Sequence, residues 1–106
     1  MSRLASEFWV KAYIKTLSLR GISSFVIARG DSQAGAVIIK LSPMNGTATL
    51  YQKGFDLESN GSTWVVLHRG AESEIDAAIE RQRMFDPDLW VIEVENPRND
   101  AYLIDP

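Results

Sequence analysis

The segment Ser73–Glu95, SEIDAAIERQRMFDPDLWVIEVE, holds a helix pattern, a stop signal and a strand pattern in direct succession. Apolar residues recur at three- and four-residue spacing in its first half, which predicts an amphipathic helix over about Ser73–Phe85. Pro87 disfavours helical geometry in the residue before it and therefore ends the helix. The β-branched and aromatic residues that follow predict a strand over Leu89–Glu95. The buried face of the helix is expected to carry Ile75, Ala78, Ile79, Gln82 and Phe85.

The ends of this helix carry charges of the expected sign. Glu74 and Asp76 stand in its first turns, and Arg81 and Arg83 stand late, as the helix dipole favours. Ser73 followed by Asp76 resembles a capping box with Asp in the position of Glu, which would start the helix at Ser73.

Upstream of this segment, the pattern predicts one more helix and four strands. A broad apolar stripe predicts a helix over about Leu4–Leu19, with Leu4, Phe8, Trp9, Ala12, Tyr13 and Leu17 on its buried face. Stretches rich in β-branched and aromatic residues predict strands at Ser24–Ala28, Ala36–Leu41, Thr47–Gln52 and Thr63–His68. Turn residues separate the strands at Gly30–Gly35, Pro43–Gly46 and Asn60-Gly61, which is typical of an antiparallel meander. Near the end of the chain, Tyr102–Ile104 are expected to dock as a short edge segment.

These elements predict a single domain of the α+β class over residues 1–106, in the order α-β-β-β-β-α-β. We expect an antiparallel sheet of four to five strands, packed with two helices. No repeat or linker-like stretch suggests a domain boundary within the sequence.

Composition narrows the class of protein. With 106 residues, a net charge of −3 and no cysteine, the chain cannot form disulfides, thiolate metal sites or a thiol nucleophile. The acidic balance argues against a nonspecific binder of nucleic acid or anionic membrane. Its apolar runs are far too short for a membrane span, and the N-terminus lacks a signal-peptide pattern. We therefore expect a cytoplasmic protein that does not bind membranes.

Three stretches resemble a known family. They are Trp9-Val10-Lys11-Ala12-Tyr13, Arg29-Gly30-Asp31 running into Ala34-Gly35-Ala36-Val37, and Phe85-Asp86-Pro87-Asp88-Leu89-Trp90-Val91-Ile92-Glu93. This pattern is similar to the domain of unknown function 1491, a family of small bacterial proteins, and the similarity covers nearly the whole chain. The resemblance implies a bacterial cytoplasmic protein, and it implies no particular activity, cofactor or functional residue.

The strands carry apolar side chains on both sides of the sheet. Alternation places Phe25, Ile27, Val37, Ile39, Leu41, Trp90, Ile92 and Val94 on one face, and Val26, Ala28, Ile38, Tyr51, Leu89 and Val91 on the other. In an antiparallel sheet with one face exposed to solvent, apolar and polar side chains alternate more regularly along each strand. Either the two helices divide between the faces, or another molecule covers one face. The second arrangement predicts a self-associating or partner-binding surface.

An acidic group forms the first candidate site: Asp86, Asp88, Glu93 and Glu95. Carboxylates beside a strand hold divalent cations in metal-dependent nucleases, but alternation puts Asp88 on the face opposite to Glu93. The favoured interpretation is that Asp86 and Asp88 shape the helix-to-strand turn by accepting backbone N–H bonds. We expect no metal site and no cofactor.

Arg29 and Asp31 belong to a second candidate, the loop Arg29–Gly35. Its two glycines could let backbone N–H groups cradle an anion, with Arg29 assisting. Phosphate-binding loops open onto a helix, however, whereas this loop opens onto a strand. A structured hairpin turn is therefore the favoured interpretation.

Charged and aromatic residues supply the remaining candidates. Arg81 and Arg83 could bind a carboxylate or phosphate, or could pair with Asp86 and Asp88, and the sequence leaves both open. His68, the one histidine, is expected to be structural because no orienting acid stands near it in sequence. Trp64 and Trp90 are expected in the core, while Trp9 is a candidate for either core or binding.

The sequence leaves the function unknown and favours a non-enzymatic binding or regulatory domain, acting as a homodimer or with a protein partner. Catalytic residues stay unknown, and the candidate binding residues are Arg29, Asp31, Arg81, Arg83, Asp86, Asp88 and Trp9. The alternative is a small hydrolase or transferase with an Arg/Asp cleft. A cleft that gathers Arg29, Arg83 and Asp86 would favour that enzyme, whereas a flat apolar patch would favour the binding domain.

Overall fold

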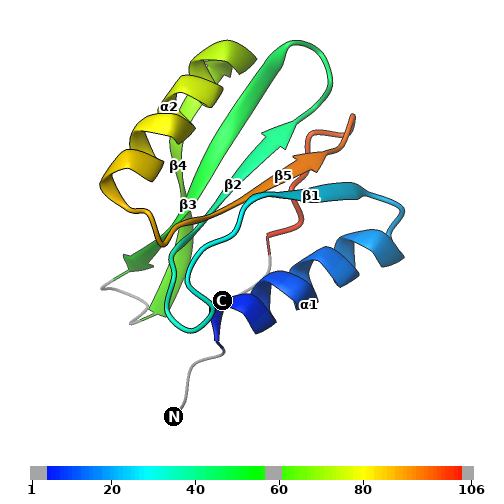
Figure 1. The fold of residues 1–106 in the computed structure, drawn as a ribbon. Helices are drawn as coiled ribbons and strands as arrows, with labels where there is room; N and C mark the ends of the chain where they lie inside the picture. Colours follow the sequence, from blue (N-terminus) through cyan, green and yellow to red (C-terminus); the bar gives the residue numbers. More distant parts are fainter. Residues whose placement is uncertain (1–4, 57–60, 104–106) are drawn as a thin grey trace.

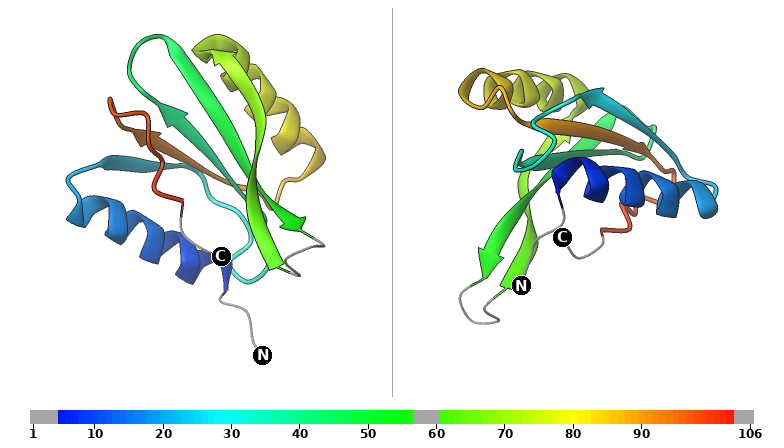
Figure 2. Two further views of the ribbon diagram at one scale, coloured as in Figure 1. Left: turned by 180° about the vertical axis from the view of Figure 1, so that it is seen from behind. Right: turned by 60° about the horizontal axis from the view of Figure 1, so that its bottom comes forward.

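The computed structural model describes residues 5–56 and 61–103, and it shows a five-stranded sheet with a helix on each face (Figure 1; Figure 2). The elements are α1 (Ser6–Leu19), β1 (Ser23–Ala28), β2 (Val37–Ser42), β3 (Thr47–Asp56), β4 (Gly61–Ala71), α2 (Glu72–Phe85) and β5 (Trp90–Glu95). The predicted element order is therefore confirmed. The predictions for Leu4, Asn60 and Ile104 fall outside the described residues.

The sheet is mixed, so the prediction of a purely antiparallel sheet is wrong. The strand order is β1-β5-β2-β3-β4, in which β5 runs antiparallel to β1 and parallel to β2. Two antiparallel pairings join β2, β3 and β4, so β4 runs in the same direction as β2. Helix α2 then carries the chain back, and β5 starts at the same end of the sheet as β2. The predicted meander holds for β2, β3 and β4, while β1 pairs with β5.

Alternate side chains of the central strands pack against different helices. On one face, Val37, Ile39, Leu41, Trp90, Ile92 and Val94 form a core with Trp9, Val10, Tyr13 and Leu17 of α1. On the other face, Ile38, Ala48, Leu50, Leu89 and Val91 form a second core with Ile75 and Ile79 of α2. The chain's own helices therefore divide between the faces, which is the first of the two arrangements that the sequence allowed. Figure 2 shows α1 and α2 on opposite sides of the sheet.

The predicted facing of β1 is wrong by one residue. Phe25 pairs with Glu93 and Val26 pairs with Ile92, so Val26 lies on the α1 face and Phe25 on the α2 face. A bulge between Val26 and Ala28 then returns Ala28 to the α2 side. Tyr51, which pairs with Ile39, likewise packs against the α1 core and not on the opposite face.

Two details of the helices also differ from expectation. The N-cap of α2 is Ala71, without a side-chain cap, so the capping box predicted at Ser73 is wrong. Phe85 is 89% exposed because it is the last helical residue, while Ile75 and Ile79 fill the space above the sheet. In α1, Phe8 is 62% exposed and its neighbour Trp9 is buried.

The loop between β1 and β2 crosses the inserted strand β5. With β5 between them, β1 and β2 lie two strand spacings apart, roughly 10 Å, which a tight hairpin turn does not span. The Asp31 N–H donates to the Asp88 carbonyl at 2.9 Å, and the Trp90 N–H donates to the Ala36 carbonyl at 2.8 Å. The loop is thus a bridge over the start of β5, and the prediction of a hairpin turn is wrong.

We expect Gly30→Ala and Gly35→Ala each to lower the free energy of unfolding by about 3 kcal/mol, measured by chemical denaturation. A Cβ at either position would overlap the Asp88 carbonyl oxygen, a backbone atom that cannot rotate away. Gly70→Ala is the matched control, because there the nearest atom is the Glu74 carboxylate at the end of a flexible side chain. Equal losses in all three variants would contradict the close approach of the bridge to β5.

Tyr13 should make the fold sensitive to alkaline pH. Its hydroxyl is buried and donates to the Ala101 carbonyl at 2.5 Å. Burial raises the pKa of Tyr13, and the charges of Asp100 and Tyr51 raise it further. The unfolded chain ionises near pH 10 while the native state resists, so this stability is complete below pH 10 and is lost as the pH rises above it.

At pH 11 this loss should amount to about 1.4 kcal/mol. Tyr13→Phe should be less stable than wild type at neutral pH by about 1 kcal/mol, because the hydrogen bond is missing. Between about pH 9 and about pH 11, however, the variant should lose less stability than wild type in urea titrations. Parallel curves for the two proteins would show that Tyr13 does not resist ionisation.

Candidate functional site

Three segments meet at the end of the sheet where β5 begins. The bridge 29–36 packs on the turn that joins α2 to β5 and on the first turn of α1. The Ser6 hydroxyl donates to the Gly35 carbonyl at 2.6 Å, and the Glu7 N–H donates to the Ser32 carbonyl at 2.9 Å. This convergence brings Arg29, Asp31, Asp86 and Asp88 to one end of the sheet, and we call these four residues with Glu7 and Trp90 the bridge site.

Arg29 is engaged within the bridge site. Its guanidinium forms an ion pair with the Glu7 carboxylate and lies 5.1 Å from the centre of the Trp90 ring. The Arg29 side chain is 67% exposed, so this ion pair is screened by water and contributes only about 0–1 kcal/mol. Arg29 therefore links α1 to β5 at the surface.

The carboxylates of Asp31 and Asp86 bind backbone N–H groups, whereas the Asp88 carboxylate accepts none within residues 5–56 and 61–103, contrary to expectation. Asp31 Oδ2 accepts the N–H groups of Gln33 and Ala34 at 3.1 and 2.8 Å, and the Asp31 carbonyl accepts the Trp90 indole N–H at 2.8 Å. Asp86 Oδ1 accepts the Asp88 N–H at 3.1 Å, the turn-shaping bond expected of Asp86. These carboxylates are occupied in holding the turn and the bridge in shape.

The other predicted residues lie apart from the bridge site. Arg83 pairs with Glu80 at 3.3 Å on its own helix, and Arg81 has no ion pair within residues 5–56 and 61–103. Trp9 is buried and stacks 5.0 Å from Tyr13. Two hollows of the described surface are lined by other residues, and Arg29, Arg83 and Asp86 line neither of them.

His68 has an acidic neighbour that the sequence did not suggest. The Glu74 carboxylate, on α2, lies 3.6 Å from His68 Nε2 at the edge strand β4. Both side chains are largely exposed. The contact is long and open to solvent, which suits a surface pair better than an orienting acid for catalysis.

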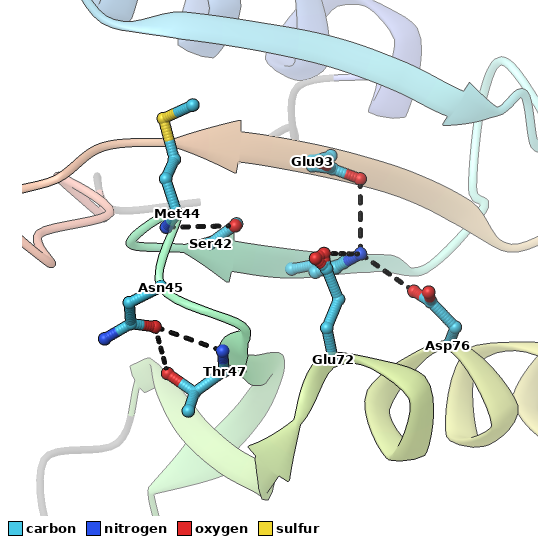
Figure 3. Close-up of polar contacts among 8 residues, drawn as sticks. Ser42, Met44, Asn45, Thr47, Glu72, Asp76 and Glu93 are labelled. Atoms are coloured by element: carbon cyan, nitrogen blue, oxygen red, sulfur yellow. Dashed lines mark hydrogen bonds and ion pairs between the residues drawn. The ribbon is translucent and has the colours of Figure 1, made fainter.

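A charge cluster around Lys40 was missed altogether. Lys40 lies in the centre of β2, and its side chain is only 6% exposed. Its Nζ lies 2.8 Å from Asp76 Oδ1, 3.5 Å from Glu93 Oε1 and 3.6 Å from Glu72 Oε2. Figure 3 shows the three carboxylates converging on one ammonium group from α2 and β5.

The lysine of this cluster stays protonated. Burial lowers the pKa of Lys40, but the hydrogen bond from its ammonium to Asp76 and the charges of Glu93, Asp76 and Glu72 together outweigh burial, and the pKa is raised. A permanently charged lysine is neither a nucleophile nor a general base. The ammonium occupies the centre that a metal ion would need, and no His, Asp or Glu group in the described ranges is arranged to bind a metal.

The cluster holds α2 on the sheet. Glu72 and Asp76 stand in the first turns of α2, where carboxylates also suit the helix dipole. The Glu72 N–H donates to the Gly46 carbonyl at 2.9 Å, so the β2–β3 turn caps the same end of the helix. Within that turn, Asn45 Oδ1 accepts the Thr47 N–H and hydroxyl at 3.0 and 2.6 Å (Figure 3).

The chain is similar over nearly its whole length to one family of proteins. The family described as "Protein of unknown function (DUF1491)" matches residues 4–104. The chain belongs to this family. The resemblance inferred from the sequence is thereby confirmed. No curated protein matches the chain.

Three solved structures of similar proteins share the fold. A crystal structure of a DUF1491 family protein from Caulobacter crescentus CB15 is 33% identical, covers 98% of each chain and has a TM-score of 0.88. An NMR structure of a DUF1491 family protein from the same organism is 32% identical, covers 100% of this chain and 97% of that one, with a TM-score of 0.85. A solution structure of an A. tumefaciens protein is 30% identical, covers 90% and 87%, and has a TM-score of 0.75.

The structure also bears on the membrane prediction. None of the helices in residues 5–56 and 61–103 is both long enough and apolar enough to span a bilayer.

We expect Lys40→Met to lower the free energy of unfolding by about 2 kcal/mol in chemical denaturation at neutral pH. Methionine keeps most of the apolar stem but leaves three carboxylates facing one another without a cation. Because the pKa of Lys40 is raised, its contribution is complete below the ordinary lysine value of 10.5 and is lost at higher pH. Lys15→Met, on the exposed side of α1, should change stability by less than about 0.5 kcal/mol. A Lys40→Met protein as stable as the Lys15→Met control would show that the cluster does not hold α2.

Proposed function

We propose that the chain is a non-enzymatic interaction domain that self-associates through the outer edge of β1. This strand lies at the edge of the sheet, and its residues Phe25, Val26 and Ile27 are 49%, 38% and 50% exposed. The strand Ser23–Ala28 contains no charged residue and no proline. Natural sheets usually protect edges with charges, proline or a covering segment, because an open edge pairs with other strands. The uncharged, apolar edge is the observation that carries the proposal.

The opposite edge of the sheet is less suited to this role. Strand β4 also exposes Val65, Val66 and Leu67. A bulge interrupts its pairing in this same stretch, and the charged Arg69 follows closely. Equal charges facing each other across two copies would oppose pairing of β4 with itself. In β1 the bulge comes at the end, so Ser23–Val26 keep a regular register.

A second copy of the same strand is the proposed occupant. Antiparallel pairing of two β1 strands about a two-fold axis joins two sheets and places only uncharged side chains opposite one another. A groove of about 360 Å³ between α1 and β1 adjoins this edge and adds contact area. It is lined by Ile14, Ser18, Gly21, Ile22, Ser23, Ser24 and Phe25. Six residues and a flanking groove make an interface at the small end of the usual range, which suits a dissociation constant of roughly micromolar size.

The alternative, a small hydrolase or transferase, draws no support from the arrangement of its candidate residues. Arg29 is paired with Glu7, Arg83 with Glu80, and Asp86 accepts a bond within its own turn. We therefore propose the interaction domain alone.

Light scattering coupled to size exclusion, at loading concentrations from about 10 µM to about 1 mM, should show the wild-type protein shifting from monomer to dimer. Phe25→Lys should shift the equilibrium at least about tenfold toward monomer, because two lysines would approach across the two-fold axis. The variant should remain folded, since residue 25 pairs with Glu93 and a lysine there has an acidic neighbour.

Val66→Lys, on the β4 edge, is the matched control and should dimerise like wild type. A wild-type protein that stays monomeric at about 1 mM would refute self-association. Monomer formation by Val66→Lys together with an unaffected Phe25→Lys would refute the assignment to β1.

A further inference from the structure

A second hollow lies where the end of α1 meets the tail of the chain. It has a volume of about 230 Å³ and is lined by Arg20, Gly21, Ile22, Asn96, Arg98 and Tyr102. The tail after β5 passes on the α1 side of the sheet (Figure 2), where the Tyr13 hydroxyl holds the Ala101 carbonyl. We call this set of residues the Arg20–Arg98 hollow.

Two arginines in this hollow lack an acidic partner. Within residues 5–56 and 61–103, neither Arg20 nor Arg98 forms an ion pair, whereas Arg29 and Arg83 each pair with a glutamate. The guanidinium of Arg20 lies 4.7 Å from the centre of the Tyr102 ring, an arrangement that orients the guanidinium without neutralising it. In a chain with a net charge of −3, two unneutralised arginines at one hollow form a local positive site.

The turn that carries Arg98 is held firmly in place. Asn96 is buried, and its side-chain amide donates to the Asp100 carbonyl at 2.7 Å while its Oδ1 accepts the Arg98 N–H at 3.1 Å. The side chain of the nearby Asp100 is engaged as well, because its Oδ1 accepts the Tyr102 N–H at 2.7 Å. The positions of both arginine backbones are thus set before any ligand arrives.

Tyr102 adopts a backbone conformation that a bulky side chain rarely takes. Its φ angle is +46°, in the left-handed region, and Asn99 in the same tail has a φ of +60°. Such conformations persist only where surrounding contacts impose them, and they gather at ligand-binding sites. Here the strained backbone keeps the aromatic ring beneath Arg20.

We propose that the Arg20–Arg98 hollow binds a small anion that carries a phosphate or carboxylate group. Guanidinium groups bind both groups through paired N–H donors, and two of them can hold one anion from two sides. The hollow is smaller than the 300–1,000 Å³ of pockets for drug-sized ligands, so it suits a phosphomonoester or a dicarboxylate better than a nucleotide. At the end of α1, the carbonyls of Leu17 and Ser18 accept N–H groups from residues 20–22, so these two acceptors do not face an anion in the hollow.

Titration of the ¹⁵N-labelled full chain with inorganic phosphate, and separately with malonate, tests this proposal. Sodium chloride at matched ionic strength corrects for screening. We expect saturable shifts of the backbone amides of Gly21, Ile22, Arg98 and Tyr102, with a dissociation constant of roughly 1 mM for the simple ions. Saturation by phosphate alone would assign the site to phosphate compounds, and saturation by malonate alone would assign it to carboxylates.

Arg98→Gln should weaken binding about tenfold without unfolding the protein, because Arg98 is exposed and its side chain has no partner in the described chain. Arg20→Gln/Arg98→Gln should abolish the saturable shifts. Arg81→Gln/Arg83→Gln removes the same charge from α2 and should bind like wild type. The monomeric Phe25→Lys variant should also bind normally, since the hollow lies within one chain.

Three outcomes would overturn the proposal. The shifts in phosphate and malonate could be no larger than in sodium chloride. The second outcome is that the saturable shifts persist in Arg20→Gln/Arg98→Gln. The third is that Arg81→Gln/Arg83→Gln loses these shifts to the same extent as Arg20→Gln/Arg98→Gln. A fall in melting temperature for Arg20→Gln without any saturable shift in wild type would show that Arg20 serves only the end of α1 and the Tyr102 ring.

Discussion

The parallel pairing of β5 with β2 runs from Val37 opposite Trp90 to Ser42 opposite Glu95 and forms the centre of the sheet. Strands in parallel contact are buried on both faces, because the connections that make them parallel place helices there. All of β2 is buried, and in β5 only Glu93 and Glu95 are partly exposed. The division of the two helices between the two faces follows from this requirement. The same insertion separates β1 from β2, so the chain needs the bridge 29–36.

The contacts of the bridge explain why its residues, which resemble an anion-binding loop in the sequence, have structural roles instead. A loop that cradles phosphate must leave several N–H groups free to point at the ligand. In the bridge, the N–H groups of Asp31, Gln33, Ala34 and Gly35 all donate within the protein. Its glycines are required because the backbone passes against the Asp88 carbonyl. The bridge 29–36 and the turn that joins α2 to β5 therefore form one structural unit at the start of β5.

Local patterns in the sequence predicted the helices and strands. The order of the strands and the facing of β1 depend on pairings between distant segments, which the sequence did not predict. Apolar periodicity located both helices and all five strands, because each depends on neighbouring residues. The position of β5 in the sheet depends instead on the path of α2 across the sheet. The residues of β5 do not by themselves indicate that it pairs with β1 and β2. The one-residue error in the facing of β1 arises in the same way, since register is set by pairing with β5.

The Lys40 cluster shows the same limit for polar residues. A lysine inside the apolar stretch Ala36–Leu41 is a signal that could have been noticed, since buried lysines need acidic partners. Its partners Glu72, Asp76 and Glu93 lie on two other elements and meet Lys40 only in the folded chain. Alternation along the strand separates Glu93 from Asp88, but it does not indicate which cation on another element Glu93 meets.

Gly21 and Ile22 connect the two surfaces to which we assign binding. They line both the groove beside β1 and the Arg20–Arg98 hollow. The N–H groups of Arg20, Gly21 and Ile22 donate to carbonyls of Leu17 and Ser18, which ties this wall to the end of α1. Because these bonds hold the wall in place within one chain, pairing of β1 should leave the hollow unchanged, and the coupling free energy between dimerisation and anion binding should be close to zero.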